Sequence, residues 1–128
     1  MFLMNSWYVA AWDHELIDGK LLARTILGKP VLLYKGESGR VVALDNRCCH
    51  RGAKLSNGRM EGDDVRCMYH GLKFDPSGKC IQIPGPALKV SCGVARWRAR
   101  TSKKASVPWS LLSISLATRS VALSQRQV

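Results

Sequence analysis

Two short apolar runs stand close together in the first half of the chain. They are "PVLLYK" at 30–35 and "RVVALD" at 40–45, both rich in Val and Leu, and the polar stretch "GESG" lies between them. Short runs of this composition on either side of a glycine-containing connection are typical of a β-hairpin. The pattern therefore predicts two paired antiparallel strands over 30–45.

A second pair of runs follows in 72–84. "LKFD" and "KCIQIP" flank "DPSG", where Pro76 and Gly78 suit a tight turn. The stretch between the two hairpins, 46–66, is rich in Gly and Arg and shows no long helical period. Only "DHELIDGKL" opens like a short helical turn, with Asp13 as its cap. Several short strands separated by turns predict an all-β fold, a small antiparallel sandwich or barrel.

The composition changes after "IPGP". Residues 87–128 contain eight serines and 8 of the 20 Lys and Arg, but no Asp or Glu and little strand-like alternation. We therefore predict one folded domain, 1–86, followed by a basic, serine-rich tail, 87–128, that packs little. Two interpretations of the tail stay open: a solvated, partly disordered extension, or out-of-frame sequence after a frameshift.

The net charge of +11 belongs mainly to this tail. Residues 1–86 carry 12 Lys and Arg against all 9 Asp and Glu, and no basic stripe with interleaved aromatic residues appears there. Proteins that bind nucleic acid concentrate positive charge on one face of the folded body. The distribution of charge therefore argues against specific nucleic-acid binding.

No segment of the sequence has the length or composition of a membrane span. The longest apolar candidate, "VPWSLLSISLA" at 107–117, is too short and too rich in serine, and residues 1–12 lack the basic start and the cleavage site of a secretory signal. We therefore expect no membrane association and a cytoplasmic location. In such a reducing compartment, clusters of cysteines bind metal more often than they form disulfides.

Four residues with metal-ligating side chains occur in two similar groups. The spacing is Cys48-x-His50, sixteen intervening residues, and then Cys67-x-x-His70. Two thiolates and two imidazoles can hold a tetrahedral zinc ion or an iron–sulfur cluster with mixed ligands. Zinc fingers bring two cysteines first and two histidines later, whereas each group here supplies one of each, which favours the cluster. The remaining histidine, His14, is interpreted as a solvent-facing residue.

The stretch "CCHRGAKLSNGRMEGDDVRCMYHGLKFDPSGKC" resembles the cluster-binding region of Rieske proteins. The resemblance implies one [2Fe–2S] cluster, with two cysteines on one iron and two histidines on the other. It also implies a Rieske-type antiparallel sandwich or barrel in which two loops form a cluster-binding subdomain. The resemblance implies four residues that bind the cofactor and its metal. They are Cys48, His50, Cys67 and His70.

Three further residues take their interpretation from the same resemblance. Gly52 and Gly71 match the family's small residues beside each histidine, which would let backbone amides approach the cluster. Cys49 occupies a variable position of the motif. We therefore interpret Cys49 as a small bystander packed against the loop and Cys48 as the ligand.

Departures from the respiratory type of Rieske protein indicate the branch. Ala53 and Tyr69 stand where that type carries two disulfide-forming cysteines, and Leu72 and Phe74 stand where it carries hydroxyl donors. These departures imply the low-potential branch of oxygenases and ferredoxins. The lead-in "NSWYVAAWDHEL" at 5–16 is similar to the start of Rieske mononuclear-iron oxygenases, especially the vanillate O-demethylase type.

This resemblance implies an electron-transfer module. A flavin/iron–sulfur reductase would donate electrons, and a mononuclear Fe(II) in the oxygenase catalytic domain would accept them for O-demethylation or hydroxylation of an aromatic acid. That iron needs two histidines and a carboxylate. The chain has three histidines, and two are assigned to the cluster. We therefore expect a truncated oxygenase chain that binds no mononuclear iron and has no catalytic residues. Whether the chain is an enzyme stays open, and the alternative is a free-standing Rieske-type ferredoxin.

Overall fold

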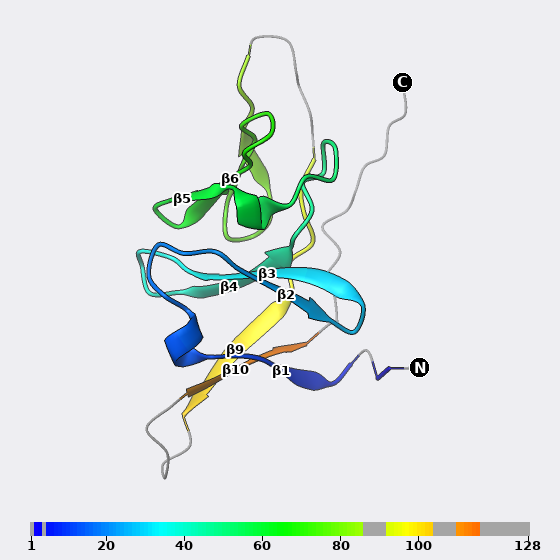
Figure 1. Cartoon of the computed structure of the whole chain (residues 1–128), viewed down its shortest axis with the longest axis vertical. Coiled ribbons are helices and arrows are strands. Elements are labelled where there is room, and N and C mark those ends of the chain that lie inside the picture. Colours follow the sequence, from blue (N-terminus) through cyan, green and yellow to red (C-terminus); the bar gives the residue numbers. More distant parts are fainter. Residues whose placement is uncertain (1, 4, 86–91, 104–109, 116–128) are drawn as a thin grey trace.

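Three antiparallel sheets make up the part of the protein that the computed structural model describes, which is residues 2–3, 5–85, 92–103 and 110–115 (Figure 1). Two short 3₁₀ turns, η1 (Asp13–Glu15) and η2 (Leu55–Asn57), are the helical elements of these residues. Asp13 is the first residue of η1 and not its cap. No helix in the described ranges is long and apolar enough to cross a membrane. The expected all-β antiparallel fold is confirmed.

The central sheet is buried on both faces. Its strands, with the second in the middle, are β2 (Leu22–Ile26), β3 (Lys29–Lys35) and β4 (Val41–Asp45). The first predicted hairpin is confirmed, because β3 and β4 pair with Val31 opposite Asp45. Alternate residues of β3 point to opposite faces. Val31 and Leu33 pack in one core cluster. Leu32 and Tyr34 pack in the other. An unbroken apolar run suits a strand that is buried on both sides.

One face of the central sheet is covered by a sheet built from both ends of the described chain (Figure 1). Its strands, in spatial order, are β1 (Trp7–Trp12), β10 (Ser110–Ser115) and β9 (Arg98–Lys103). Trp7 lies opposite Ser115, and Trp12 lies opposite Leu111. Trp97, just before β9, is buried in the same cluster. The apolar core on this side therefore needs residues that follow position 86.

The structure corrects the expectation that residues after 86 pack little, for the strands it describes. The sequence of β10 is "SLLSIS", and its Leu112 and Ile114 are buried against the central sheet. A segment without acids and rich in serine can form a strand when its inward side chains are apolar. The remainder of 87–128 lies outside the described residues. The domain boundary at 86 and the frameshift interpretation stay predictions.

The other face of the central sheet packs against a four-stranded sheet. Its strands, in spatial order, are β5 (Arg59–Glu61), β6 (Asp64–Arg66), β7 (Lys73–Phe74) and β8 (Cys80–Gln82). The second predicted hairpin is confirmed, with Lys73 of β7 opposite Gln82 of β8. Val65 and Phe74 are fully buried against the apolar side chains of β3 and β4.

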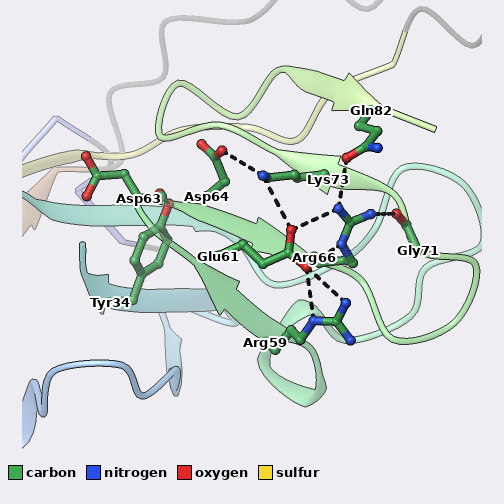
Figure 2. Close-up of polar contacts among 9 residues, drawn as sticks. All are labelled: Tyr34, Arg59, Glu61, Asp63, Asp64, Arg66, Gly71, Lys73 and Gln82. Carbon is green, nitrogen blue, oxygen red and sulfur yellow. Dashed lines mark hydrogen bonds and ion pairs between the residues drawn. The ribbon is translucent and has the colours of Figure 1, made fainter. Parts of the chain in front are cut away.

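Tyr34 attaches this four-stranded sheet to the central sheet (Figure 2). Its hydroxyl donates a hydrogen bond to the carbonyl oxygen of Asp63, in the turn between β5 and β6, at 3.0 Å. The carboxylate of Asp63 in turn accepts the amide of Ser38 at 2.9 Å. Burial raises the pKa of Tyr34 well above its ordinary value, so the hydroxyl stays a donor at neutral pH. The sheet that carries the candidate site is thereby fixed to the core.

Candidate metal centre

The first group of candidate ligands lies on a tight loop between β4 and η2, residues 48–53, here called loop 1. The amide of Cys48 donates to the carbonyl oxygen of Ala53 at 2.8 Å. The amide of Gly52 donates to the carbonyl oxygen of Cys48 at 2.9 Å. These two bonds fold the backbone back on itself, so His50 lies at the tip of the loop.

The second group lies on a loop of the same design between β6 and β7, residues 67–72, here called loop 2. The amide of Cys67 donates to the carbonyl oxygen of Leu72 at 2.7 Å, and the amide of Gly71 donates to the carbonyl oxygen of Cys67 at 3.1 Å. In both loops a cysteine opens the turn and a glycine stands four residues later. The repeated backbone design gives each loop one buried cysteine and one more exposed histidine.

The two glycines are needed because of their backbone conformation. Gly52 has φ 68° and Gly71 has φ 75°, in the left-handed region that residues with a Cβ rarely adopt. A Cβ on Gly52 would meet nothing within 4 Å, whereas a Cβ on Gly71 would lie 2.8 Å from Cγ of Pro84. Gly71 therefore has a steric requirement that Gly52 lacks.

The two loops bring the thiols of Cys48 and Cys67 together inside the molecule. These residues are 4% and 2% exposed, and both belong to the apolar cluster between the sheets. Burial, together with the charge of the neighbouring Cys67 sulfur and a hydrogen bond that the Cys48 thiol donates to it, raises the pKa of the Cys48 thiol to about 11. A metal must displace this proton, because the thiolate is the ligand. The pair is therefore a dry, two-thiolate binding position.

The same loops bring the two candidate histidines together nearer the surface. Nδ1 of His50 lies 3.1 Å from Nδ1 of His70, and the ring centroids are 4.7 Å apart. The exposed ring of Tyr69 lies against His70, with the ring centroids 4.0 Å apart. His14 is not part of this group, because it lies beside Asp13 on η1.

The arrangement offers two pairs of ligands and not one set of four. Among the residues that the structure describes, no three His, Cys, Asp or Glu side chains are placed to hold a single metal ion. A structural zinc ion needs four ligands around one point. A cluster in which one iron takes two thiolates and the other takes two imidazoles needs two separate pairs. The residues present therefore fit the binuclear group better than the mononuclear one.

Cys49 forms a disulfide with Cys92 and does not join the metal-ligating pairs. This bond corrects the interpretation of Cys49 as a bystander, because it ties loop 1 to the segment that leads into β9. Adjacent side chains in an extended loop point apart, so Cys48 and Cys49 can have different partners. No local pattern marks Cys92, and the only signal for it in the sequence is that three cysteines, Cys49, Cys80 and Cys92, remained without a ligand role. Among the described cysteines, the three free ones are Cys48, Cys67 and Cys80.

A sequence family described as the Rieske [2Fe-2S] domain matches residues 6–97. One similar protein is a toluene-4-sulfonate monooxygenase system iron-sulfur subunit from Comamonas testosteroni, which is 65% identical over 85 residues. That alignment covers 66% of this chain and 24% of the relative. The oxygenase component of dicamba O-demethylase from Stenotrophomonas maltophilia is 47% identical over 83 residues, covering 65% of this chain and 24% of that protein. The chain thus spans about a quarter of the length of these relatives.

Two further comparisons agree with these. A vanillate O-demethylase oxygenase subunit from Pseudomonas sp. (strain HR199 / DSM 7063) is 42% identical over 85 residues, with 66% of this chain and 24% of the relative covered. A crystal structure of dicamba monooxygenase superposes with a TM-score of 0.74 at 38% identity. That superposition covers 88% of this chain and 34% of the other.

Proposed function

The chain belongs to the Rieske [2Fe-2S] domain family, and from this membership we propose that it is the electron-transfer module of an aromatic-compound oxygenase component. The observation that carries the proposal is the pairing of two buried thiols and two imidazoles on matched loops inside the segment that matches the family. A flavin/iron–sulfur reductase is proposed as the donor. The catalytic domain of the oxygenase, with its mononuclear iron, is proposed as the acceptor.

We assign the ligands as two pairs. Cys48 and Cys67 hold one iron of the cluster, and His50 and His70 hold the other. Nδ1 is the proposed ligating atom of each histidine, because the two Nδ1 atoms face each other at 3.1 Å. A bound [2Fe–2S] cluster supplies reversible one-electron transfer at a potential set by its ligands and surroundings.

The protein's own groups give the two pairs different tasks. The buried position of Cys48 and Cys67 keeps water away from the thiolates and places them at the edge of the core. His70 is exposed, so its ring can reach a partner surface. Electrons would therefore pass at the histidine side, and the cysteine side would anchor the centre.

The proposed reaction follows from the names of the relatives. They act, by those names, on toluene-4-sulfonate, dicamba and vanillate, each an aromatic acid. We propose an aromatic acid as the substrate of the whole oxygenase, with dioxygen activated outside the residues described here. We also propose the cytoplasm as its location, where a reductase would be available.

The proposal is tested by reconstituting the full chain with iron and sulfide. We expect about two irons per chain and, after reduction, the Rieske-type EPR signal of a histidine-ligated [2Fe–2S] cluster. Cys48→Ala should abolish the signal, because one iron then keeps a single protein ligand. The matched control is Cys80→Ala, which removes a free cysteine that is assigned no iron. Equal iron loss in both variants, or one tetrahedral metal per chain in the wild type, would refute the assignment.

A second measurement separates the module from the free-standing ferredoxin. The reduced chain is mixed with aromatic acids in the absence of any other iron protein, and we expect no product. Product at stoichiometric levels would contradict the proposal. Reduction by the reductase of an oxygenase system, followed by transfer to a separately supplied catalytic domain, would support the module. Transfer to unrelated acceptors alone would favour the ferredoxin.

A further inference from the structure

Arg66 lies at the end of β6, directly before Cys67, and its guanidinium lies beside loop 2 (Figure 2). Nε and Nη2 donate to the two carboxylate oxygens of Glu61 at 2.6 and 2.8 Å. Nη2 also donates to the side-chain oxygen of Gln82 at 2.8 Å. Nη1 donates to the carbonyl oxygen of Gly71 at 2.8 Å. The side chain is only 17% exposed, and all three of its nitrogens have acceptors.

The carbonyl of Gly71 is the acceptor that matters for the site, because Gly71 follows His70 in the chain. The amide of Gly71 closes loop 2 by donating to Cys67. Its carbonyl is held from outside the loop by Arg66. Both peptide groups of one left-handed residue are therefore fixed, and the backbone beside the histidine has little freedom to rotate.

Glu61 orients the guanidinium that makes this contact. Its carboxylate accepts the paired donors of Arg66. Nη2 of Arg59 lies 3.0 Å from its Oε1, and Nζ of Lys73 lies 3.4 Å from its Oε2 (Figure 2). Paired nitrogen-to-oxygen bonds of this kind fix the plane of a guanidinium as well as its position. The hydrogen bonds from Arg66 and its neighbours lower the pKa of Glu61 to about 2, so the carboxylate is ionised at neutral pH.

Loop 1 shows no equivalent contact among the residues that the structure describes. Within the described part of the chain, no side chain donates to the carbonyl oxygen of Gly52, the residue that matches Gly71. The side-chain contact to the glycine carbonyl is thus made at loop 2, which carries the more exposed histidine.

We propose that Arg66 is a positioning residue, which fixes the orientation of His70 toward the metal by clamping the carbonyl of Gly71. The inference rests on the proposed function, because it assigns a role to Arg66 only if His70 is a ligand. Arg66 itself is not assigned as an iron ligand. Its effect reaches the metal through the backbone of loop 2.

The experiment compares reconstituted full-length variants. Arg66→Met keeps the aliphatic stem of the side chain but removes every donor. Residues that orient metal ligands typically change metal affinity about 10-fold to 100-fold when they are removed. We therefore expect Arg66→Met to bind iron about 10-fold more weakly than wild type, measured at equilibrium against a competing chelator. We also expect shifted or broadened EPR lines, because the histidine-ligated iron would lose its single geometry.

The chain offers a matched control in Arg59. It contacts the same carboxylate but, in the described part of the chain, makes no hydrogen bond to Gly71, so Arg59→Met should match wild type in iron affinity and EPR signal. Arg66→Lys should recover little of the loss, because a single ammonium cannot span Glu61 and Gly71 together.

The outcomes separate the two proposals. A wild-type chain that binds no [2Fe–2S] cluster overturns the proposed function. A wild-type chain that binds the cluster, with Arg66→Met equal to Arg59→Met in both readouts, overturns only the role of Arg66. If Arg66→Met does not fold, Glu61→Gln decides, since it frees the guanidinium and leaves the donors present. Altered EPR lines in Glu61→Gln support the clamp, and an unchanged spectrum overturns it.

Discussion

The two loops share one backbone design but are attached to the rest of the molecule by different chemistry. Loop 1 is tied by the disulfide from Cys49 to Cys92, whose partners are 43 residues apart in sequence. Loop 2 is tied by the hydrogen bonds of Arg66, whose acceptors lie on the same four-stranded sheet or in the loop itself. One attachment is covalent and reaches across the fold, and the other is ionic and local.

The two halves of the site therefore depend on different parts of the fold. Loop 1 depends on the segment that leads into β9, and therefore on residues after position 86. Loop 2 depends on β5, β6 and β8. A covalent attachment is sensitive to thiol reductants, whereas an ionic attachment is sensitive to acid. Each sensitivity gives a way to disturb one loop without the other.

The largest effect is expected from breaking the disulfide. A cross-link that closes a loop of 43 residues stabilises a protein by about 4 kcal/mol in the chain-entropy treatment. Cys92→Ser should therefore lower the free energy of unfolding by about that amount, measured by urea denaturation without reductant. Cys80→Ser is the control, because Cys80 is free, and it should cost much less. A thiol reductant should bring wild type to the level of Cys92→Ser, and no shift would show that the bond does not form.

A smaller effect, and a sharper comparison, comes from the two matched glycines. Gly52→Ala should cost about 1–2 kcal/mol, the usual penalty for a left-handed residue with a Cβ. Gly71→Ala should cost about 2–4 kcal/mol, because its Cβ also meets the ring of Pro84. The urea midpoints of both variants, each made also in a Pro84→Ala background, would test this. The extra cost at Gly71 should shrink without the ring, and equal costs in both backgrounds would refute the steric explanation.

The smallest effect concerns acid and loop 2. The pKa of Glu61 is about 2 in the folded chain against an ordinary 4.5, with the hydrogen bond from Arg66 as the main cause. The ionised carboxylate therefore contributes stability at pH values above about 4.5, and this contribution is lost as pH falls toward about 2. The difference in urea midpoint between wild type and Glu61→Gln should be constant near neutral pH and should narrow across that window. A difference that grows on acidification would contradict the sign.

The two hairpins and the family resemblance could be predicted because their signals are local in the sequence. The hairpin over 30–45 needs only neighbouring apolar runs and a turn, and the second hairpin needs only "DPSG" between two runs. The resemblance to Rieske oxygenases is confirmed for the same reason, because the ligand spacing and its glycines fall within one short stretch. The ligand assignment itself stays a proposal.

The attachments of the loops could not be predicted, because nothing local specifies them. Cys49 has three cysteines besides Cys48 as candidate partners, and only the path of the chain after β8 brings Cys92 to it. Arg66 is one of many arginines in the sequence, and its long side chain selects acceptors only after β5, β8 and loop 2 are assembled around it.

Spacing along the chain is enough to predict which residues form short strands and which four side chains are candidates for metal binding. Only the packing of the sheets brings β10 to β1, Cys49 to Cys92 and Arg66 to Gly71. Each of these contacts joins groups that chain connectivity leaves free to lie apart. They form because burying the apolar faces of three sheets against one another fixes where every strand end and loop must lie.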